Sequence, residues 1–560
     1  MNTHGMIPEN PSSAGVRTIA YPSPPNPNGD LHLGHLSGPV LSADVYIRHR
    51  RLLGDPAYFV VGTDDNQIWT TAMAEQRGET PQQTADLFAE RIAGTLEKVQ
   101  VDCAHLYRPN ASPYHADLVR DTVRRLYDRG HLVAEEAPAL VCEHCDDLYL
   151  FEVRVTGTCP HCGEGTCGNA CEDCGLPNQV VDMIDPVCKQ CGNTPTEKPV
   201  RRLFFPLEPY REMLVEYHRQ TAMSTQHRAL CHRLMAGELP RVVSSHISDW
   251  GIPVPLPGFD GQVVSAWLEM APGYLAASAE LSDKIGRDDG WQAFWGSGNN
   301  RVVQFFGFDN CWNHGVLYPA LLHAFDETVR PPVAFVSNQL YRLDYSKFST
   351  SRDHAVWTRD LVAKNSADTV RFYVAFTAPE VERSNFSLAE FADFVSDELI
   401  GRWQPWLASV QTRVDAGCAG LAPEGLAWTA NQQSYRDRLG EFLAGARADY
   451  APESFSLQRA TRRVMRLVHE AQAFGVAEAA WADLPSATSQ NQAGIALELA
   501  TIRVLALISA PLMPEFSERL WRALGYSSAV GGWDDEPQLV PPDQAVSGLD
   551  AEFFPPPVVS

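Results

Sequence analysis

The sequence has too few basic residues for a protein that coats nucleic acid. Lysine and arginine number 45 against 69 acidic residues, which gives a formal net charge of −24. This balance argues against non-specific binding to a phosphate backbone, although it leaves room for a local basic groove. The lengths of the apolar runs predict no membrane span, and the first fifteen residues hold no apolar signal core. We therefore expect a cytoplasmic protein with no membrane partner.

Cysteine is sparse outside one short region, which excludes a disulfide framework. Eight of the 13 cysteines form four C-x-x-C pairs, and each pair is a tight knuckle that aims two thiolates at one point. Eight thiolates suit two structural Zn²⁺ ions in a reducing compartment. The long, short and long gaps favour nesting, with the inner pairs on one ion and the outer pairs on the other; sequential pairing is the alternative. The pairs are Cys142/Cys145, Cys159/Cys162, Cys171/Cys174 and Cys188/Cys191.

The pattern of apolar residues predicts an α/β fold followed by helices. Strands are expected at residues 16–21 and 59–62, and helices at 36–53 and 80–99. Such alternation places ligands at the carboxyl ends of parallel strands. From Ser387 onward the chain is predicted to be helical, starting with a capping box to Glu390 and ending in an irregular tail.

The most informative segment is His32-Leu33-Gly34-His35, which follows a turn-rich stretch and opens a predicted helix. Residues three apart at a helix start share a face, and the free amides there attract phosphate. Two imidazoles can donate hydrogen bonds to a triphosphate as charge builds on it, and Gly34 leaves room for a flat base. A pair of solvated histidines is the alternative.

Together these features resemble the class I aminoacyl-tRNA synthetases of the methionyl type, from about Arg17 to Gly525. The histidine segment resembles the first class signature, and the cysteine knuckles resemble the family's insertion. The other matching segments are Gly62-Thr63-Asp64-Asp65, Trp267-Leu268-Glu269, Gly273-Tyr274, Phe306 to His314, and Lys347-Phe348-Ser349-Thr350-Ser351, which occupies the place of the second signature, K-[MF]-S-K-S.

The resemblance implies a Rossmann-like catalytic domain with a zinc-knuckle insertion and a helical, anticodon-binding-like bundle. The expected boundaries are 1–138 and 201–335 for the two halves of the catalytic domain, 139–200 for the insertion, 336–386 for the signature loop and connection, 387–530 for the bundle, and 531–560 for the tail.

The resemblance also implies a reaction and its residues. An amino acid carboxylate attacks the α-phosphate of ATP, accompanied by Mg²⁺, and the aminoacyl group then passes to an acceptor oxygen. Asp64 is expected to hold the α-ammonium group. The other implied residues are His32, His35 and Lys347 for catalysis on the phosphates; Gly34, Gly307, Asp309, Ser349 and Ser351 for the nucleotide; and Trp267, Tyr274, Asn313 and His314 for the amino acid pocket.

Several positions depart from the family pattern. Thr350 replaces the second lysine of the second signature, and losing one such electrostatic contact costs about 3–4 kcal/mol of transition-state stabilisation. Asp249 stands where the family's I-S-R segment has arginine. Asn313 stands at a usually aromatic position, which suggests a bound side chain smaller or more polar than methionine.

The departures on the anticodon side favour an acceptor other than tRNA. Pro405 and Ser409 fall where the family reads the anticodon with asparagine and arginine, although Trp481 matches a stacking tryptophan. We therefore expect a ligase that loads an amino acid onto a small molecule, as in hydrazine-synthetase-type acylation, with a separate partner enzyme. A methionine–tRNA ligase and a non-catalytic binding protein are the alternatives.

Overall fold

The computed structural model describes residues 15–347, 356–424, 427–481 and 484–558. The chain divides into two compact units. The first comprises Met1–Leu31, Tyr58–Thr95 and Cys103–Gln339, and the second His32–Ala57, Leu96–Asp102 and Leu340–Ser560. Each unit is described by itself.

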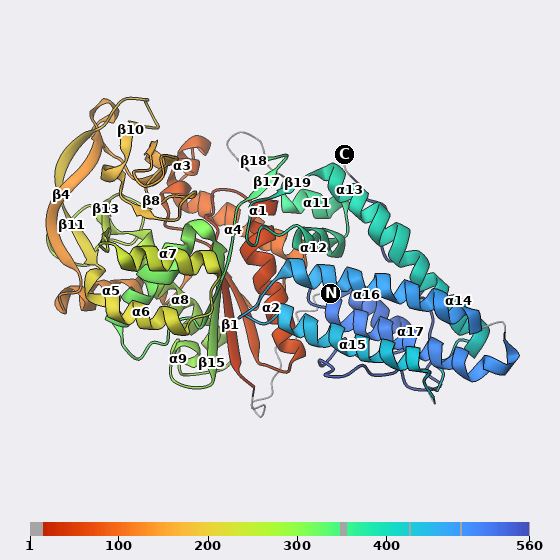
Figure 1. Cartoon of the computed structure of the whole chain (residues 1–560). Coiled ribbons are helices and arrows are strands. Elements are labelled where there is room, and N and C mark those ends of the chain that lie inside the picture. The colour runs from red at the N-terminus through yellow and green to blue at the C-terminus, as the bar shows by residue number, and fades with distance from the viewer. Residues whose placement is uncertain (1–14, 348–355, 425–426, 482–483, 559–560) are drawn as a thin grey trace. The chain divides into compact units, whose positions relative to one another are not determined.

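The first unit is built on a five-stranded sheet with the order β16-β15-β1-β2-β3 (Figure 1). β1 pairs with β15, β15 with β16, and β2 with β3, all in parallel. Since β2 and β15 lie on opposite sides of β1, the strand order reverses there, and the carboxyl ends of these strands form a ligand-binding edge. The strands are β1 (Arg17–Pro22), β2 (Ala57–Gly62), β3 (His105–Tyr107), β15 (Asn300–Gly307) and β16 (Ala334–Asn338).

The helices between residues 115 and 325 cover this sheet because their apolar faces and the buried strands share one core, which includes Phe205, Trp295 and Phe306. The predicted helix at 80–99 is confirmed as α4. The helices are α3 (Ile68–Arg77), α4 (Pro81–Lys98), α5 (His115–Asp128), α6 (Arg211–Gln220), α7 (Thr225–Ala236), α8 (Ala266–Lys284), α9 (Gln292–Trp295) and α10 (Tyr318–Phe325).

The cysteine-rich region forms small antiparallel sheets with short turns. Two long strands, β4 and β11, pair over most of their length and frame it. The strands are β4 (Val133–Cys142), β5 (Leu148–Tyr149), β6 (Val155–Thr158), β7 (Gly165–Thr166), β8 (Asn169–Ala170), β9 (Pro177–Asn178), β10 (Ile184–Cys188), β11 (Thr196–Pro206) and β12 (Arg241–Val243), with β13 (Ser245–Ile247) and β14 (Gln262–Val264) following.

The second unit is mostly helical, as predicted. Its centre holds a fully buried ion pair: the Arg371 guanidinium donates to Asp44 at 2.6 Å, and both side chains are at most 1% exposed. The elements are α1 (Leu33–His35), α2 (Leu41–Leu52), β17 (Tyr341–Leu343), β18 (Ser346–Lys347), α11 (Thr358–Lys364), α12 (Ala367–Phe376), β19 (Ser384–Phe386), α13 (Leu388–Phe394), α14 (Gln404–Cys418), α15 (Ala430–Asp449), α16 (Leu457–Glu478), α17 (Thr488–Ser509) and α18 (Pro514–Ala523).

Three local expectations for this unit have different outcomes. Ser387 precedes α13, but its side chain makes no capping hydrogen bond, so the predicted capping box is wrong. By length and composition α17 could span a membrane, contrary to the expectation that no apolar run is long enough. Within this helix, 89% of the apolar stretch is buried inside the structure, as in a core helix. The tail is irregular as predicted, yet Phe553 and Phe554 pack into the core.

Candidate active site and metal centres

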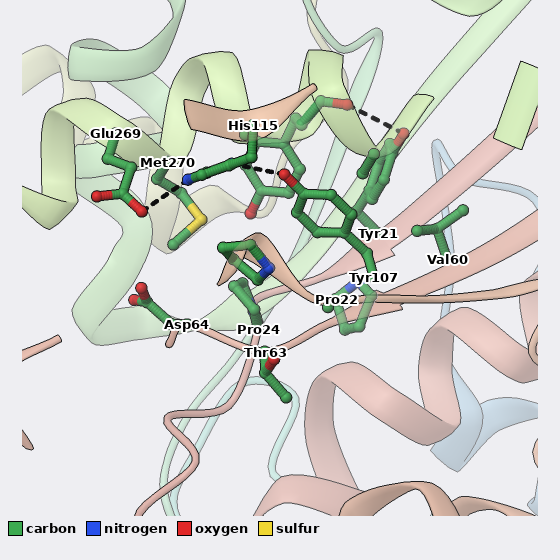
Figure 2. A pocket seen from close by; sticks show the side chains of 15 residues that line it. Tyr21, Pro22, Pro24, Val60, Thr63, Asp64, Tyr107, His115, Glu269 and Met270 are labelled. Atoms are coloured by element: carbon green, nitrogen blue, oxygen red, sulfur yellow. Dashed lines mark hydrogen bonds and ion pairs between the residues drawn. The ribbon is translucent and has the colours of Figure 1, made fainter. Parts of the chain in front are cut away.

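A cavity opens at the carboxyl ends of β1, β2 and β3 (Figure 2). Tyr21 and Pro22 end β1, Thr63 and Asp64 follow β2, and Tyr107 ends β3, and all five line the cavity. Side chains of α8 close another wall, among them Met270, Tyr274 and Ala277. The walls are therefore mostly apolar and aromatic, with Asp64 as one of few charged groups.

Two carboxylates face this cavity together. Figure 2 shows Asp64 and Glu269 on the same side of the pocket, and both are buried, at 6% and 3% exposure. Burial raises the pKa of Asp64 well above its usual range, and the nearby Glu269 raises it further. Such a pair favours a cationic ligand, because a positive charge would offset both the desolvation and the repulsion.

A chain of hydrogen bonds fixes Glu269. The His115 Nε2 atom lies 2.7 Å from Glu269 Oε1, and the Tyr107 hydroxyl lies 2.5 Å from His115 Nδ1. The Asn66 amide donates to the same Oε1 atom at 2.8 Å. The other oxygen, Oε2, has no partner among the described residues, so it can accept a hydrogen bond from a bound ligand.

The residues predicted to line the amino acid pocket do not all lie at the first cavity. Tyr274 lines the cavity, and its hydroxyl donates to His314 Nε2 at 3.1 Å, while His314 Nδ1 donates to the Asn310 carbonyl. Burial lowers the pKa of His314 to about 3, so this imidazole is neutral. His314 thus orients Tyr274 from behind the wall.

Two further predicted pocket residues lie elsewhere. Trp267 lines a second cavity, where its indole donates to Glu152 at 2.6 Å. Asn313 is fully buried and is absent from the lining of the first cavity. Its amide therefore gives no polar character to that cavity.

The two signature histidines lie in the second unit and hold each other in place. Gly34 N–H donates to His32 Nδ1 at 3.0 Å, and His32 N–H donates to His35 Nδ1 at 3.3 Å. Since both Nδ1 atoms accept, both protons are on Nε2. The rings stack with centroids 3.9 Å apart. Burial lowers the pKa of His32 well below its usual range and that of His35 to about 4, so each ring is a neutral Nε2–H donor.

The remaining nucleotide-binding residues are placed in part. A Cβ atom on Gly307 would meet Asp309 Oδ1 at 2.4 Å, so the glycine permits the position of that carboxylate. Lys347 ends β18. Ser349, Ser351 and Thr350 lie outside the described residues, and their roles stay predictions.

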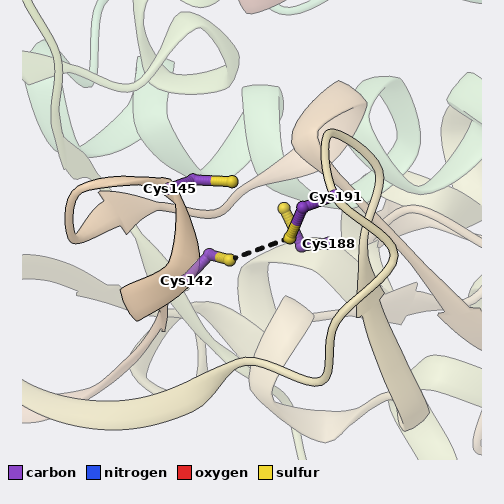
Figure 3. A group of neighbouring side chains, drawn as sticks. All are labelled: Cys142, Cys145, Cys188 and Cys191. Atoms are coloured by element: carbon purple, nitrogen blue, oxygen red, sulfur yellow. Dashed lines mark hydrogen bonds between the residues drawn. The ribbon is translucent and has the colours of Figure 1, made fainter.

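The cysteines form two clusters with the nested pairing. The outer pairs combine as Cys142, Cys145, Cys188 and Cys191 (Figure 3), and the inner pairs as Cys159, Cys162, Cys171 and Cys174. Within each cluster the ligand atoms lie within 4.8 Å of one another. The Sγ atoms of Cys142 and Cys191 are 3.4 Å apart, and those of Cys162 and Cys171 3.6 Å. A tetrahedral site with zinc–sulfur bonds of about 2.3 Å needs about 3.8 Å, so both clusters fit zinc.

Sequence reasoning missed His115 and gave Glu269 no role. The available signal was an acidic residue within the otherwise apolar first half of the segment that forms α8. No signal in the sequence indicated His115, because its side chain contacts Glu269 only where α5 packs against α8.

Comparisons with known proteins match the chain to one family. A family model described as tRNA synthetases class I (M) matches residues 19–409. The methionine–tRNA ligase of Thermomicrobium roseum is 31% identical over 526 residues, covering 93% of this chain and 88% of the relative. That of Thermofilum pendens is 29% identical over 522 residues, covering 92% and 91%. The structure of Mycobacterium tuberculosis methionyl-tRNA synthetase with methionyl-adenylate has a TM-score of 0.78 at 16% identity, covering 96% of this chain and 99% of that one.

The fold and the matched family define a class I aminoacyl-tRNA synthetase, an ATP-dependent ligase. The family model matches residues 19–409, which is more than half of the chain, so the chain belongs to the methionyl-tRNA synthetase family. The relatives support the methionine–tRNA ligase alternative better than the expected small-molecule acceptor, for which no comparison gives support.

Proposed function

We propose that the chain activates methionine with ATP and transfers it to tRNA. The observation that carries the proposal is the first cavity, where an apolar chamber adjoins the paired carboxylates of Asp64 and Glu269. Methionine has an unbranched, polarisable side chain suited to such walls and an α-ammonium group suited to the carboxylates. The curated relatives are named methionine–tRNA ligases.

In the first step, a carboxylate oxygen of methionine attacks the α-phosphorus of ATP. A mixed anhydride forms, and the bond to pyrophosphate breaks. In the first unit, Asp64 and the free Glu269 Oε2 hold the ammonium group. The resemblance assigns the phosphates to His32 and His35, whose neutral Nε2–H groups suit donation to phosphate oxygens as negative charge develops.

In the second step, a ribose hydroxyl at the tRNA end attacks the aminoacyl carbonyl carbon, and AMP leaves. Mg²⁺ would neutralise charge on the triphosphate. The two cysteine clusters would each hold one structural Zn²⁺, since four thiolates leave no open position for water.

Pyrophosphate exchange across the proteinogenic amino acids, followed by charging of total tRNA, tests the proposal. We expect exchange that depends on methionine, and methionylated tRNA. Exchange with another amino acid would refute the substrate, and adenylate formation without tRNA charging would refute the acceptor.

A further inference from the structure

The first unit contains a second cavity of about 120 Å³, lined by the cysteine-rich region, β11 to β13 and the start of α8. It shares no lining residue with the first cavity. Aromatic side chains form much of its wall: Tyr149, Phe151, Trp267 and Trp312. A closed apolar cavity of about 150 Å³ holds benzene, so a volume of about 120 Å³ limits the ligand to a single ring or a short branched chain.

A buried arginine without a counter-charge lines this cavity. Arg202 lies on β11 and is only 6% exposed. It donates to the Pro138 carbonyl at 2.5 Å, but its Nε–H has no partner, and no described carboxylate forms an ion pair with it. Its cross-strand neighbour, Glu135, pairs with Arg241 instead. An unpaired buried cation is costly, and an anion in the cavity would offset that cost.

Two more unpartnered donors line the same cavity. They are Asn178 Nδ2, on β9, and Trp312 Nε1, which follows β15; their residues are 5% and 2% exposed. Donors on three separate elements call for a ligand rich in acceptors, and a carboxylate offers two oxygens with about four lone pairs.

Two acidic side chains also line the cavity, and neither opposes an anion strongly. Glu152 Oε1 accepts from Trp267, and burial raises the pKa of Glu152 to about 7, so near neutral pH much of it is protonated and can donate through Oε2. Asp182 is exposed and accepts from the Gln179 backbone at 3.3 Å. The lining residue His246 is neutral, because burial lowers its pKa to about 3.

We propose that this cavity binds a small organic monocarboxylate with a flat or branched apolar body. The carboxylate pairs with Arg202 and accepts from Asn178 and Trp312, and the apolar body lies against the aromatic wall. The site is separate from the amino acid pocket and independent of the proposed reaction.

The test is calorimetric titration of the full chain with benzoate and with benzamide, its neutral isostere, each with and without an excess of methionine. We expect benzoate to bind at least about tenfold more tightly than benzamide, and Arg202→Met to weaken benzoate by about tenfold or more. The matched control is Arg201→Met: Arg201 is the exposed neighbour that stacks on Phe259 outside the cavity, and its loss should leave benzoate affinity unchanged.

If Arg202→Met does not fold, Asn178→Leu replaces it and should weaken benzoate likewise. No benzoate binding, equal binding of benzamide, or equal loss in Arg201→Met would overturn the proposal. Competition by methionine would place benzoate in the amino acid pocket and also overturn it, as would inorganic phosphate binding as tightly as benzoate. The comparison of Arg202→Met with Arg201→Met locates the benzoate site even if methionine is not the substrate, so a failure of the proposed ligase activity would not affect its outcome.

Discussion

Replacing Asp64 with asparagine tests the proposed ammonium site most directly. The substitution keeps the volume and removes a charge that is only 6% exposed. A hydrogen bond to a charged group contributes about 1.5–3 kcal/mol, which corresponds to about 10- to 150-fold in affinity. We therefore expect Asp64→Asn to raise the KM for methionine by that factor in pyrophosphate exchange, with a smaller effect on the KM for ATP.

The pH dependence of the KM for methionine tests the contact between Asp64 and the ammonium group in a second way. Burial and Glu269 raise the pKa of Asp64, so in the empty pocket this carboxyl takes up a proton at a higher pH than an exposed aspartate would. The ammonium group binds the ionised form. The KM for methionine in the unmodified protein should therefore fall as pH rises through the raised pKa and then level off, whereas Asp64→Asn should lack this step.

The neighbouring aspartate provides the control. Asp65 is fully buried, and it accepts from the Thr63 hydroxyl at 2.7 Å and from Asn110 N–H at 3.3 Å. Asp65→Asn should lower the melting temperature and leave the KM for methionine unchanged. A KM for Asp64→Asn within about threefold of the parent, or an equal rise in Asp65→Asn, would refute the reasoning.

Four other predictions follow, three from the structure and one, on Thr350, from the sequence. His35→Ala should slow adenylate formation by about 10²- to 10³-fold in single-turnover assays, and an unchanged rate would exclude its role on the phosphates. Metal analysis should find two zinc ions per chain, and Cys145→Ser should lose one of them; no loss would contradict the outer cluster. Arg371→Met should lower the free energy of unfolding by about 3 kcal/mol in urea titrations, because Asp44 stays buried with a weaker counter-charge, and an unchanged midpoint would contradict this. Thr350→Lys should speed activation by about 10²-fold, and no gain in pyrophosphate exchange would mean that another group has replaced the lysine.

The sequence predicted features that depend on neighbours along the chain. Each C-x-x-C pair forms a knuckle from neighbouring residues, so the eight metal ligands could be identified without knowledge of the fold. His32, Gly34 and His35 lie within one turn, and the backbone bonds that fix both imidazoles join residues two or three positions apart. Local spacing determines such contacts. The Ser387 capping box failed because a cap also depends on side-chain geometry, which the motif alone does not specify.

The tertiary structure alone decided which distant residues share a site. The spacing of the cysteine pairs allowed nested and sequential clusters, and the paths of β4 and β11 selected the nested one. Glu269 joins Asp64 because α8 packs beside the end of β2, and His115 reaches Glu269 from α5. The same packing left Arg202 buried without a counter-charge beside a cavity. Contacts of this kind depend on the order of strands and the packing of helices, which residue spacing along the chain does not encode.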